Sequence, residues 1–198
     1  MKFAIIGATG NVGRKTIDIL EKSKLDIEQL NLVASKNSSG KKIKFKGKDL
    51  TVVALDNYDF ENADITFFAA GSSIAEKYAK NASKKTIVID NSKYFRMDKN
   101  VPLIVPEVNP EDIKRHKNII ANPNCSTIQM VLALKPLHEK FNIKRVVVST
   151  YQAVSGAGKA AMDELVSQTK DFLDKKKIKS KNFTKQIAFN LIPHIDVF

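Results

Sequence analysis

The sequence has little cysteine and histidine, the residues that cross-link small domains or hold transition metals. Its 198 residues include one cysteine, Cys125, which excludes an intramolecular disulfide and any cysteine-based zinc cluster. The three histidines, His116, His138 and His194, are far apart and lack the spacing of metal ligands. No metal site is therefore expected.

Long apolar runs are also scarce. The most apolar segments, such as Ile65–Ala70 and Arg145–Val148, are short and fit buried strands better than a bilayer span. Residues Met1–Gly7 pass directly from an expected strand into a glycine turn, without the long apolar run and cleavage site of a secretory signal. We therefore expect a cytoplasmic protein with no membrane partner.

Arginine is rare although positive charge is abundant. The formal net charge is +12, yet only four of the 33 basic residues are arginine. Proteins that read nucleic acids favour arginine and cluster their charge on one face, whereas the lysines here are spread along the chain. The sequence favours a lysine-rich solvated surface and no nucleic-acid partner. Such a basic field also suits an anionic substrate and cofactor.

Apolar strand-like segments alternate with helix-like segments in the first half of the chain, which is typical of a parallel α/β sheet. Strands are predicted at Lys2–Ile6, Leu30–Ala34, Ile65–Ala70, Thr86–Ile89, Leu103–Val105, Asn118–Ile120 and Arg145–Gln152, with a hairpin formed by Ile43–Phe45 and Leu50–Val53. Helices are predicted at Val12–Lys22, Ile74–Ser83, Ser126–Phe141 and Lys159–Leu173. Pro136 is expected to distort the third helix or to end its regular part.

A glycine-rich turn, Gly7–Ala8–Thr9–Gly10–Asn11–Val12–Gly13, lies between the first expected strand and the first expected helix. Glycine at every third position lets the backbone approach a diphosphate, and the N–H groups at the helix start bind the anion. A plain strand–turn–helix would contain the same residue types, but this placement favours nucleotide binding.

No carboxylate follows the second expected strand. An NAD site usually presents an acidic side chain there, about 20 residues beyond the glycine turn. The segment Ser35–Lys41 instead offers hydroxyls, an amide and lysines, which can accept a 2′-phosphate that a carboxylate would repel. NADP is therefore favoured over NAD, with an ordinary polar β-turn at Ser39–Lys42 as the alternative.

Cys125 stands at the expected start of the third helix, within Asn122–Thr127. The positive end of the helix dipole and its N–H groups favour a thiolate, and the same N–H groups can bind the oxyanion of a tetrahedral intermediate. A single cysteine is often only a small buried hydrophobe. The polar neighbours of Cys125 favour a nucleophile instead.

Five blocks of the sequence together resemble the aspartate-semialdehyde dehydrogenase family of the bacterial type, over all 198 residues. The blocks are Gly7–Gly13, Tyr94–Met97, Val105–Asn109, Pro123–Thr127 and Tyr151–Gly158. The resemblance implies that Cys125 forms an acyl thioester, that Arg96 binds the phosphate group and that Gln152 contacts the substrate. Asn124 is a further candidate for substrate binding.

The candidate cofactor-binding residues combine this resemblance with the two loops described above. They are Gly7, Thr9, Gly10, Asn11, Val12, Gly13, Ser35, Asn37, Ser38, Ser72, Ser155 and Gly156. Plainer alternatives stay open for several site residues. Arg96 would also suit a surface salt bridge, Gln152 the end of a strand, and Ser155–Gly158 an ordinary helix start.

The expected fold class is α/β, with a Rossmann-like NADP-binding domain at residues 1–124. The resemblance implies an incomplete α+β substrate and dimerisation domain at residues 125–198, in a homodimer or higher homo-oligomer when full length. Because the sequence stops within the apolar segment Ile187–Phe198, a fragment is expected. The fragment should be inactive alone, since His194 matches a structural position of the family and not its general base.

The reaction implied by the resemblance is the NADPH-dependent reductive dephosphorylation of L-aspartyl-4-phosphate to L-aspartate 4-semialdehyde, with release of phosphate. It serves lysine, threonine and methionine biosynthesis. Asn37 departs from the family, which commonly has an arginine there, so Lys36 or Lys41 would have to substitute. The alternatives are an enzyme like N-acetyl-γ-glutamyl-phosphate reductase, whose nucleophile context usually reads Gly–Cys–Tyr–Pro–Thr, and a non-catalytic dinucleotide-binding module.

Overall fold

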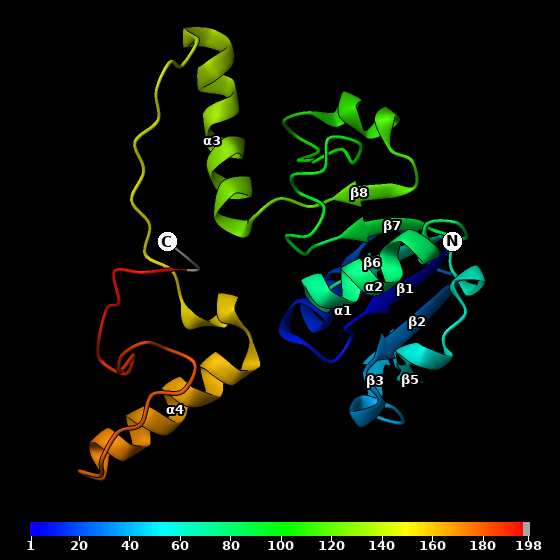
Figure 1. The fold of residues 1–198 in the computed structure, drawn as a ribbon. Helices are drawn as coiled ribbons and strands as arrows, with labels where there is room; N and C mark the ends of the chain where they lie inside the picture. The colour runs from blue at the N-terminus through cyan, green and yellow to red at the C-terminus, as the bar shows by residue number, and fades with distance from the viewer. Residues whose placement is uncertain (196–198) are drawn as a thin grey trace. The chain divides into compact units, whose positions relative to one another are not determined.

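The chain forms two compact units in a computed structural model that describes residues 1–195 (Figure 1). The first unit comprises Met1–Val146 and the second begins at Val147. No helix within residues 1–195 has the length and apolar character that a bilayer crossing requires.

The first unit contains a six-stranded parallel sheet with the order β5-β2-β1-β6-β7-β8 (Figure 1). Its strands are β1 (Lys2–Ile6), β2 (Gln29–Ala34), β5 (Val53–Ala54), β6 (Ile65–Phe68), β7 (Ile87–Asp90) and β8 (Ile119–Ala121). The strand order reverses between β1 and β6, as in doubly wound nucleotide-binding folds. The predicted Rossmann-like α/β class is thereby confirmed.

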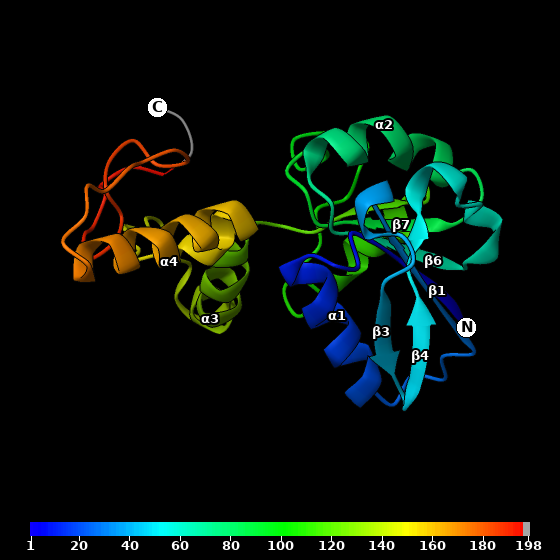
Figure 2. The same cartoon turned by 90° about the horizontal axis from the view of Figure 1, so that it is seen from below.

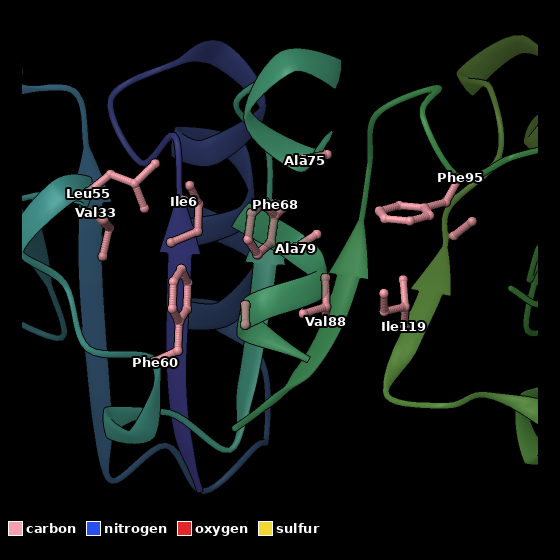
Figure 3. Packing of buried hydrophobic residues seen from close by; sticks show 12 residues of the cluster. Ile6, Val33, Leu55, Phe60, Phe68, Ala75, Ala79, Val88, Phe95 and Ile119 are labelled. Atoms are coloured by element: carbon pink, nitrogen blue, oxygen red, sulfur yellow. The ribbon is translucent and has the colours of Figure 1, made fainter. Parts of the chain in front are cut away.

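Two helices cover opposite faces of this sheet, α1 (Asn11–Lys22) and α2 (Ser72–Ala82). On one face Ile5 and Leu32 pack with Ile17 of α1. On the other face Ile6 and Val33 belong to the cluster that contains three alanines of α2 (Figure 3). Neighbouring residues of one strand thus enter opposite clusters, because side chains alternate across the pleat. Burial on both faces explains why the strands read as nearly continuous apolar runs.

A separate antiparallel hairpin, β3 (Lys42–Phe45) and β4 (Lys48–Thr51), lies beside α1 (Figure 2). Its Phe45 is buried in the cluster on the α1 face. The turn uses Lys46 at φ 47° and Gly47 at φ 77°, a left-handed pair that suits a tight hairpin. The predicted hairpin is confirmed, with β4 ending at Thr51.

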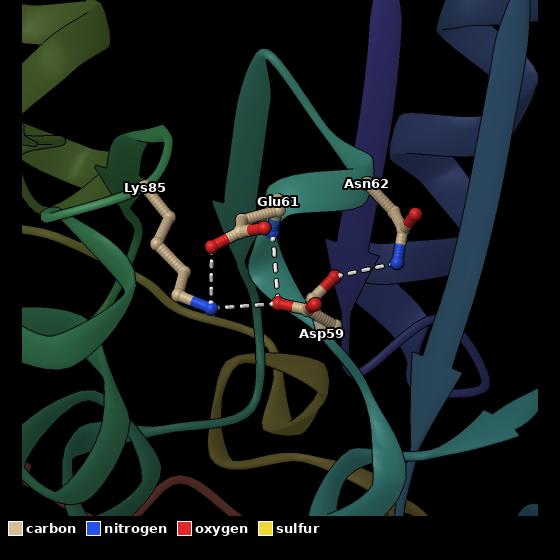
Figure 4. Close-up of polar contacts among 4 residues, drawn as sticks. All are labelled: Asp59, Glu61, Asn62 and Lys85. Atoms are coloured by element: carbon tan, nitrogen blue, oxygen red, sulfur yellow. Dashed lines mark hydrogen bonds and ion pairs between the residues drawn. The ribbon is translucent and has the colours of Figure 1, made fainter.

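A small ion cluster lies before β6 and β7, at the amino ends of these strands (Figure 4). Lys85 Nζ is 3.0 Å from Asp59 Oδ1 and 2.9 Å from Glu61 Oε1. The hydrogen bond from Lys85 lowers the pKa of Asp59, and the bonds to Glu61 and Asp59 raise the pKa of Lys85. Because these groups are exposed, the cluster stabilises the fold little. It lies away from the carboxyl ends of the strands.

The long helix α3 (Cys125–Phe141) follows β8. Pro136 lies inside α3 and does not end it, since the helix continues to Phe141. A proline removes one backbone donor and crowds the carbonyl four residues before it, a cost confined to one turn of this helix of 17 residues. Asn142 then closes the helix in a left-handed conformation, with its N–H donated to the carbonyl of His138.

Two predicted strands are not formed. Residues Arg145–Gln152 contain no strand, and Val147 and Tyr151 are 80% and 86% exposed. Their β-branched side chains suit a strand, but a strand also needs a hydrogen-bonded partner, and the described residues of the second unit form none. Within Leu103–Val105, only Leu103 forms an isolated parallel bridge, to Ala121.

The second unit is organised by α4 (Lys159–Leu173), which has the predicted bounds. Two polar side chains one turn apart on this helix are buried, Glu164 at 8% and Gln168 at 1% exposed. Glu164 accepts the N–H groups of Lys181 at 3.0 Å and Asn182 at 2.6 Å, and Gln168 accepts that of Ala188 at 3.1 Å. Burial raises the pKa of Glu164, but the donors of Asn182 and Lys181 outweigh it and lower the pKa overall. Together these bonds hold the lysine-rich segment 179–188 against α4.

Candidate functional site

The candidate residues of the first unit follow the carboxyl ends of parallel strands. The glycine turn follows β1, Ser35–Ser38 follows β2, Ser72 follows β6, Arg96 follows β7 and Cys125 follows β8. Because the strands are parallel, these segments lie along one edge of the sheet. In open α/β sheets ligands bind at this edge, beside the point where the strand order reverses.

The glycine turn approaches the loop after β6 more closely than a side chain would permit. Gly7 has φ +90°, and a Cβ added there would lie 2.6 Å from the Ala69 carbonyl oxygen. A Cβ at Gly13 would overlap the carbonyl of Gly7, whereas one at Gly10 would lie 3.3 Å from that atom. Gly7 and Gly13 are therefore required by the turn itself. Gly10 is exposed and leaves its backbone open to a ligand.

Two helices begin at this edge, on either side of the reversal point. The residues before them, Gly10 and Gly71, have no side chain to cap α1 and α2. The side chain of the preceding residue therefore caps neither helix, and the helix dipoles favour negative charge at both starts. Asn11 and Val12 in the first turn of α1 and Ser72 in the first turn of α2 lie where a diphosphate would bind. These residues fit a dinucleotide.

The loop after β2 is tied to the glycine turn by a hydroxyl pair. Thr9 Oγ1 donates to Ser38 Oγ at 3.3 Å. Ser38 is half-buried, and Ser35 and Asn37 are exposed beside it in a short 3₁₀ segment. No carboxylate occurs between residues 35 and 41, which include two lysines. The loop therefore suits the 2′-phosphate of NADP better than the free 2′-hydroxyl of NAD.

Cys125 is the first residue of α3 and its thiol is exposed. Asn124 caps the helix, since its side chain accepts the N–H of Ser126 at 3.0 Å and the hydroxyl of Ser126 at 2.6 Å. The first turn carries no acidic residue that would oppose a thiolate. Residues 1–195 contain no group of three or more histidine, cysteine, aspartate or glutamate side chains that could hold a metal ion. An exposed thiol at a helix start, without an acidic neighbour in the first turn, suits a nucleophile.

Arg96 is half-buried and its guanidinium links the loop after β7 to the segment that leads to Cys125. Nε donates to the carbonyl of Asn122 at 3.0 Å, and Nη2 donates to the carbonyl of Asn91 at 3.1 Å. The sequence alone indicated Arg96 and Cys125 but not the two asparagines. Their only local signal is that each directly follows a strand.

The remaining candidates, Gln152, Ser155 and Gly156, are exposed and belong to the second unit. Gln152 Nε2 donates to Thr150 Oγ1 at 3.3 Å. A cavity of about 380 Å³ in this unit is lined by Thr150, Gln152 and residues 192–195, which include His194. Ser155 and Gly156 form a 3₁₀ segment just before α4. Their meeting with Cys125 and the cofactor turn stays a prediction.

Family models match both parts of the chain. Residues 2–116 match the semialdehyde dehydrogenase NAD-binding domain, and residues 134–198 match the semialdehyde dehydrogenase dimerisation domain.

Individual relatives agree with these matches. Aspartate-semialdehyde dehydrogenase of Aquifex aeolicus is 54% identical over 202 residues, which cover 100% of this chain and 59% of the relative. A solved structure of aspartate semialdehyde dehydrogenase II from Vibrio cholerae, complexed with ASA, has 46% identity and a TM-score of 0.96, and covers 100% of this chain and 60% of that one. The Candida albicans enzyme with NADP has 33% identity and a TM-score of 0.61, over 72% of this chain and 48% of its own.

The chain thus spans about 59% of the Aquifex relative. With its parallel sheet, glycine turn and helix-start cysteine, and with family models that match most of its length, the chain belongs to the semialdehyde dehydrogenase family.

Proposed function

We propose that these residues are the NADP-binding and nucleophile-bearing part of an aspartate-semialdehyde dehydrogenase. The reaction is the conversion of L-aspartyl-4-phosphate to L-aspartate 4-semialdehyde and phosphate, a step of lysine, threonine and methionine biosynthesis. The observation that carries the proposal is the exposed thiol of Cys125 at the start of α3, on the same sheet edge as the glycine turn and joined through Asn122 to Arg96.

Catalysis begins at the acyl carbon of the substrate. The Cys125 thiolate forms a carbon–sulfur bond there, the carbon–oxygen bond to phosphate breaks, and phosphate leaves with its bonding electrons. Arg96 stabilises the departing charge through its planar fork of donors. N–H groups in the first turn of α3 stabilise the oxyanion of the tetrahedral intermediate. When bound, NADPH supplies the hydride that reduces the resulting thioester.

The glycine turn, Thr9 and the loop Ser35–Ser38 would hold the dinucleotide, with Ser155 and Gly156 beside the nicotinamide. The preference for NADP rests on the absence of a carboxylate between residues 35 and 41, where Lys36 and Lys41 replace the charge that Asn37 lacks. Asn124 and Gln152 would contact the substrate. We further propose a homodimer or higher homo-oligomer and a cytoplasmic location, where the single thiol stays reduced.

Alkylation of Cys125 by iodoacetamide at neutral pH, with and without NADP, distinguishes this enzyme from a non-catalytic dinucleotide-binding module. The enzyme should be alkylated faster than free glutathione, and bound NADP should change the rate because the glycine turn and the thiol share one edge. A module without catalytic function should react like an ordinary exposed thiol and be unaffected by NADP.

A further inference from the structure

Arg96 is held by backbone carbonyls and not by a carboxylate. Its two hydrogen bonds within residues 1–195 go to the carbonyls of Asn122 and Asn91. The buried carboxylate of Asp90 makes its hydrogen bonds to Ser92, whose N–H it accepts at 3.1 Å and whose hydroxyl it accepts at 2.7 Å. Burial raises the pKa of this carboxylate overall, although the charge of Arg96 acts on it through space and lowers that pKa. Neutral acceptors therefore take the two donors that fix the guanidinium, and Asp90 takes none of them. The other donors are left for an anion.

The geometry of these bonds also reserves one edge of the guanidinium. They use one N–H of Nε and one of Nη2. Arginine has five such donors, so both hydrogens of Nη1 and the second hydrogen of Nη2 are left. Nη1 and Nη2 together form the fork that binds two oxygens of a phosphoryl group in parallel. Because the guanidinium is planar, the hydrogen bonds of its Nε–Nη2 edge fix the direction of its Nη1–Nη2 edge, which we call the open edge.

The two carbonyls that hold Arg96 belong to residues whose side chains bond each other. Asn122 Nδ2 donates to Asn91 Oδ1 at 2.5 Å, and both residues are half-buried. The backbone N–H of Asn122 also donates to the carbonyl of Asp90 at 2.8 Å, and that of Asn91 to the carbonyl of Phe68 at 3.0 Å. The amide pair bridges residues 31 positions apart in the chain and fixes the spacing of the two acceptor carbonyls.

We propose that Asn91 and Asn122 are a pair of positioning residues that set the open edge of Arg96 relative to Cys125. The inference deepens the proposed function and rests on Arg96 as the phosphate-binding group. Asn122 lies three residues before Cys125, so the loop that holds Arg96 also leads into the nucleophile. Loss of either amide removes the side-chain bridge and leaves the backbone bond from Asn122 to Asp90 to link the two loops. The two acceptor carbonyls can then shift, and Arg96 keeps its charge but loses its fixed direction.

The test uses the 198-residue chain with inorganic phosphate as the probe, and it observes the Nε–H signals of its four arginines by ¹H–¹⁵N NMR. Arg96→Lys identifies the Arg96 signal. In the parent chain we expect this signal to be protected from exchange and to shift with phosphate. In Asn91→Ala and Asn122→Ala the phosphate affinity of this site should fall about tenfold, and the double variant should fall no further, because the pair acts as one unit. Asn81→Ala, at an exposed site on α2, is the matched control.

Thermal unfolding separates positioning from folding. If the asparagine variants lower Tm but leave phosphate affinity unchanged, the pair is structural and the inference is wrong. If their effects on affinity simply add, the two residues do not act as a pair, which also overturns it. If added phosphate does not shift the Arg96 signal of the parent chain, Arg96 does not bind phosphate, and both its proposed role and the positioning role are wrong. A normal phosphate response in the alanine variants would remove only the positioning role.

Discussion

At the scale of single residues, the chemistry of the site is visible in short stretches of sequence. A cysteine at a helix start, a rare arginine and a glycine turn are recognised from residue type and spacing, and the structure places each after the end of a parallel strand. No role was predicted for Asn91 or Asn122, because a hydrogen bond between residues 31 positions apart leaves no local pattern in the sequence. Local chemistry is therefore predictable, whereas the contacts that orient it depend on the folded chain.

Alanine substitutions in the glycine turn should separate folding from cofactor binding. Gly13→Ala forces a side chain onto the Gly7 carbonyl and should cost about 1–3 kcal/mol, or roughly 2–4 °C of Tm for each kcal/mol. Gly10→Ala places its methyl group 3.3 Å from the Gly7 carbonyl oxygen, which needs only a small shift, so it should lower Tm much less than Gly13→Ala. It should weaken NADP binding, because the methyl group would stand where the diphosphate approaches. Calorimetric titration and thermal unfolding measure both effects. Equal loss of Tm in the two variants would contradict this division of roles.

Ser38→Asp should reverse the cofactor preference. The parent chain is expected to bind NADP more tightly than NAD, and a carboxylate at residue 38 would repel the 2′-phosphate while offering an acceptor to the 2′-hydroxyl of NAD. The loss for NADP should be on the order of tenfold, or about 1.4 kcal/mol. Ser38→Ala is the control, since it removes the bond to Thr9 without adding charge. Equal affinities of the parent for the two cofactors would refute the NADP assignment.

At the scale of elements, the α-helices and strands that form were predicted within one or two residues, except for the short edge strand β5, whose Val53 was predicted as part of the hairpin. The helix Lys159–Leu173 has the predicted bounds, since its pattern of apolar residues is repeated over four turns. The prediction of a strand at Arg145–Gln152 was wrong, because strand propensity describes only the side chains. A strand forms only when another strand accepts its hydrogen bonds. Leu103–Val105 failed for a related reason, because only one residue finds a partner in Ala121.

The segment held by α4 should open at acid pH. Because the pKa of Glu164 is lowered in the folded unit, its carboxylate stabilises the contact above the ordinary value of 4.5, and this contribution is lost as the pH falls through the folded pKa. The protection of the Lys181 and Asn182 amides from hydrogen exchange, taken relative to the intrinsic rate at each pH, should therefore decrease as the pH falls below 4.5. At pH 7, Glu164→Gln should accelerate this exchange about tenfold, since a charge-assisted bond contributes about 1.5–3 kcal/mol.

The exposed Asp163→Asn on the same helix is the matched control and should leave this exchange unchanged. Exchange in Glu164→Gln that matches the parent at pH 7 would show that the segment is held by other contacts.

At the scale of the whole molecule, the sheet explains why distant segments form one site. Five loops from residue 7 to residue 125 reach the same edge only because every strand of the sheet runs in the same direction. The alternation of apolar and helical segments predicted this parallel sheet. Placement of Gln152, Ser155 and Gly156 beside that edge remains a prediction. The absence of steady-state turnover in these 198 residues alone also remains a prediction. Its basis is that general acid–base catalysis contributes about 10²–10⁴-fold to the rate of such a reaction.

The central claim is that Cys125 accepts an acyl group from an acyl phosphate, and the half-reaction without NADPH tests it most directly. The chain is mixed with L-aspartyl-4-phosphate, and its intact mass is measured over time beside Cys125→Ser and Arg96→Ala. We predict that the parent gains the mass of one aspartyl group, that hydroxylamine removes it, that the serine variant gains none, and that the alanine variant gains it more slowly. A folded parent chain that gains no mass, or a Cys125→Ser variant that gains as much as the parent, would contradict the account.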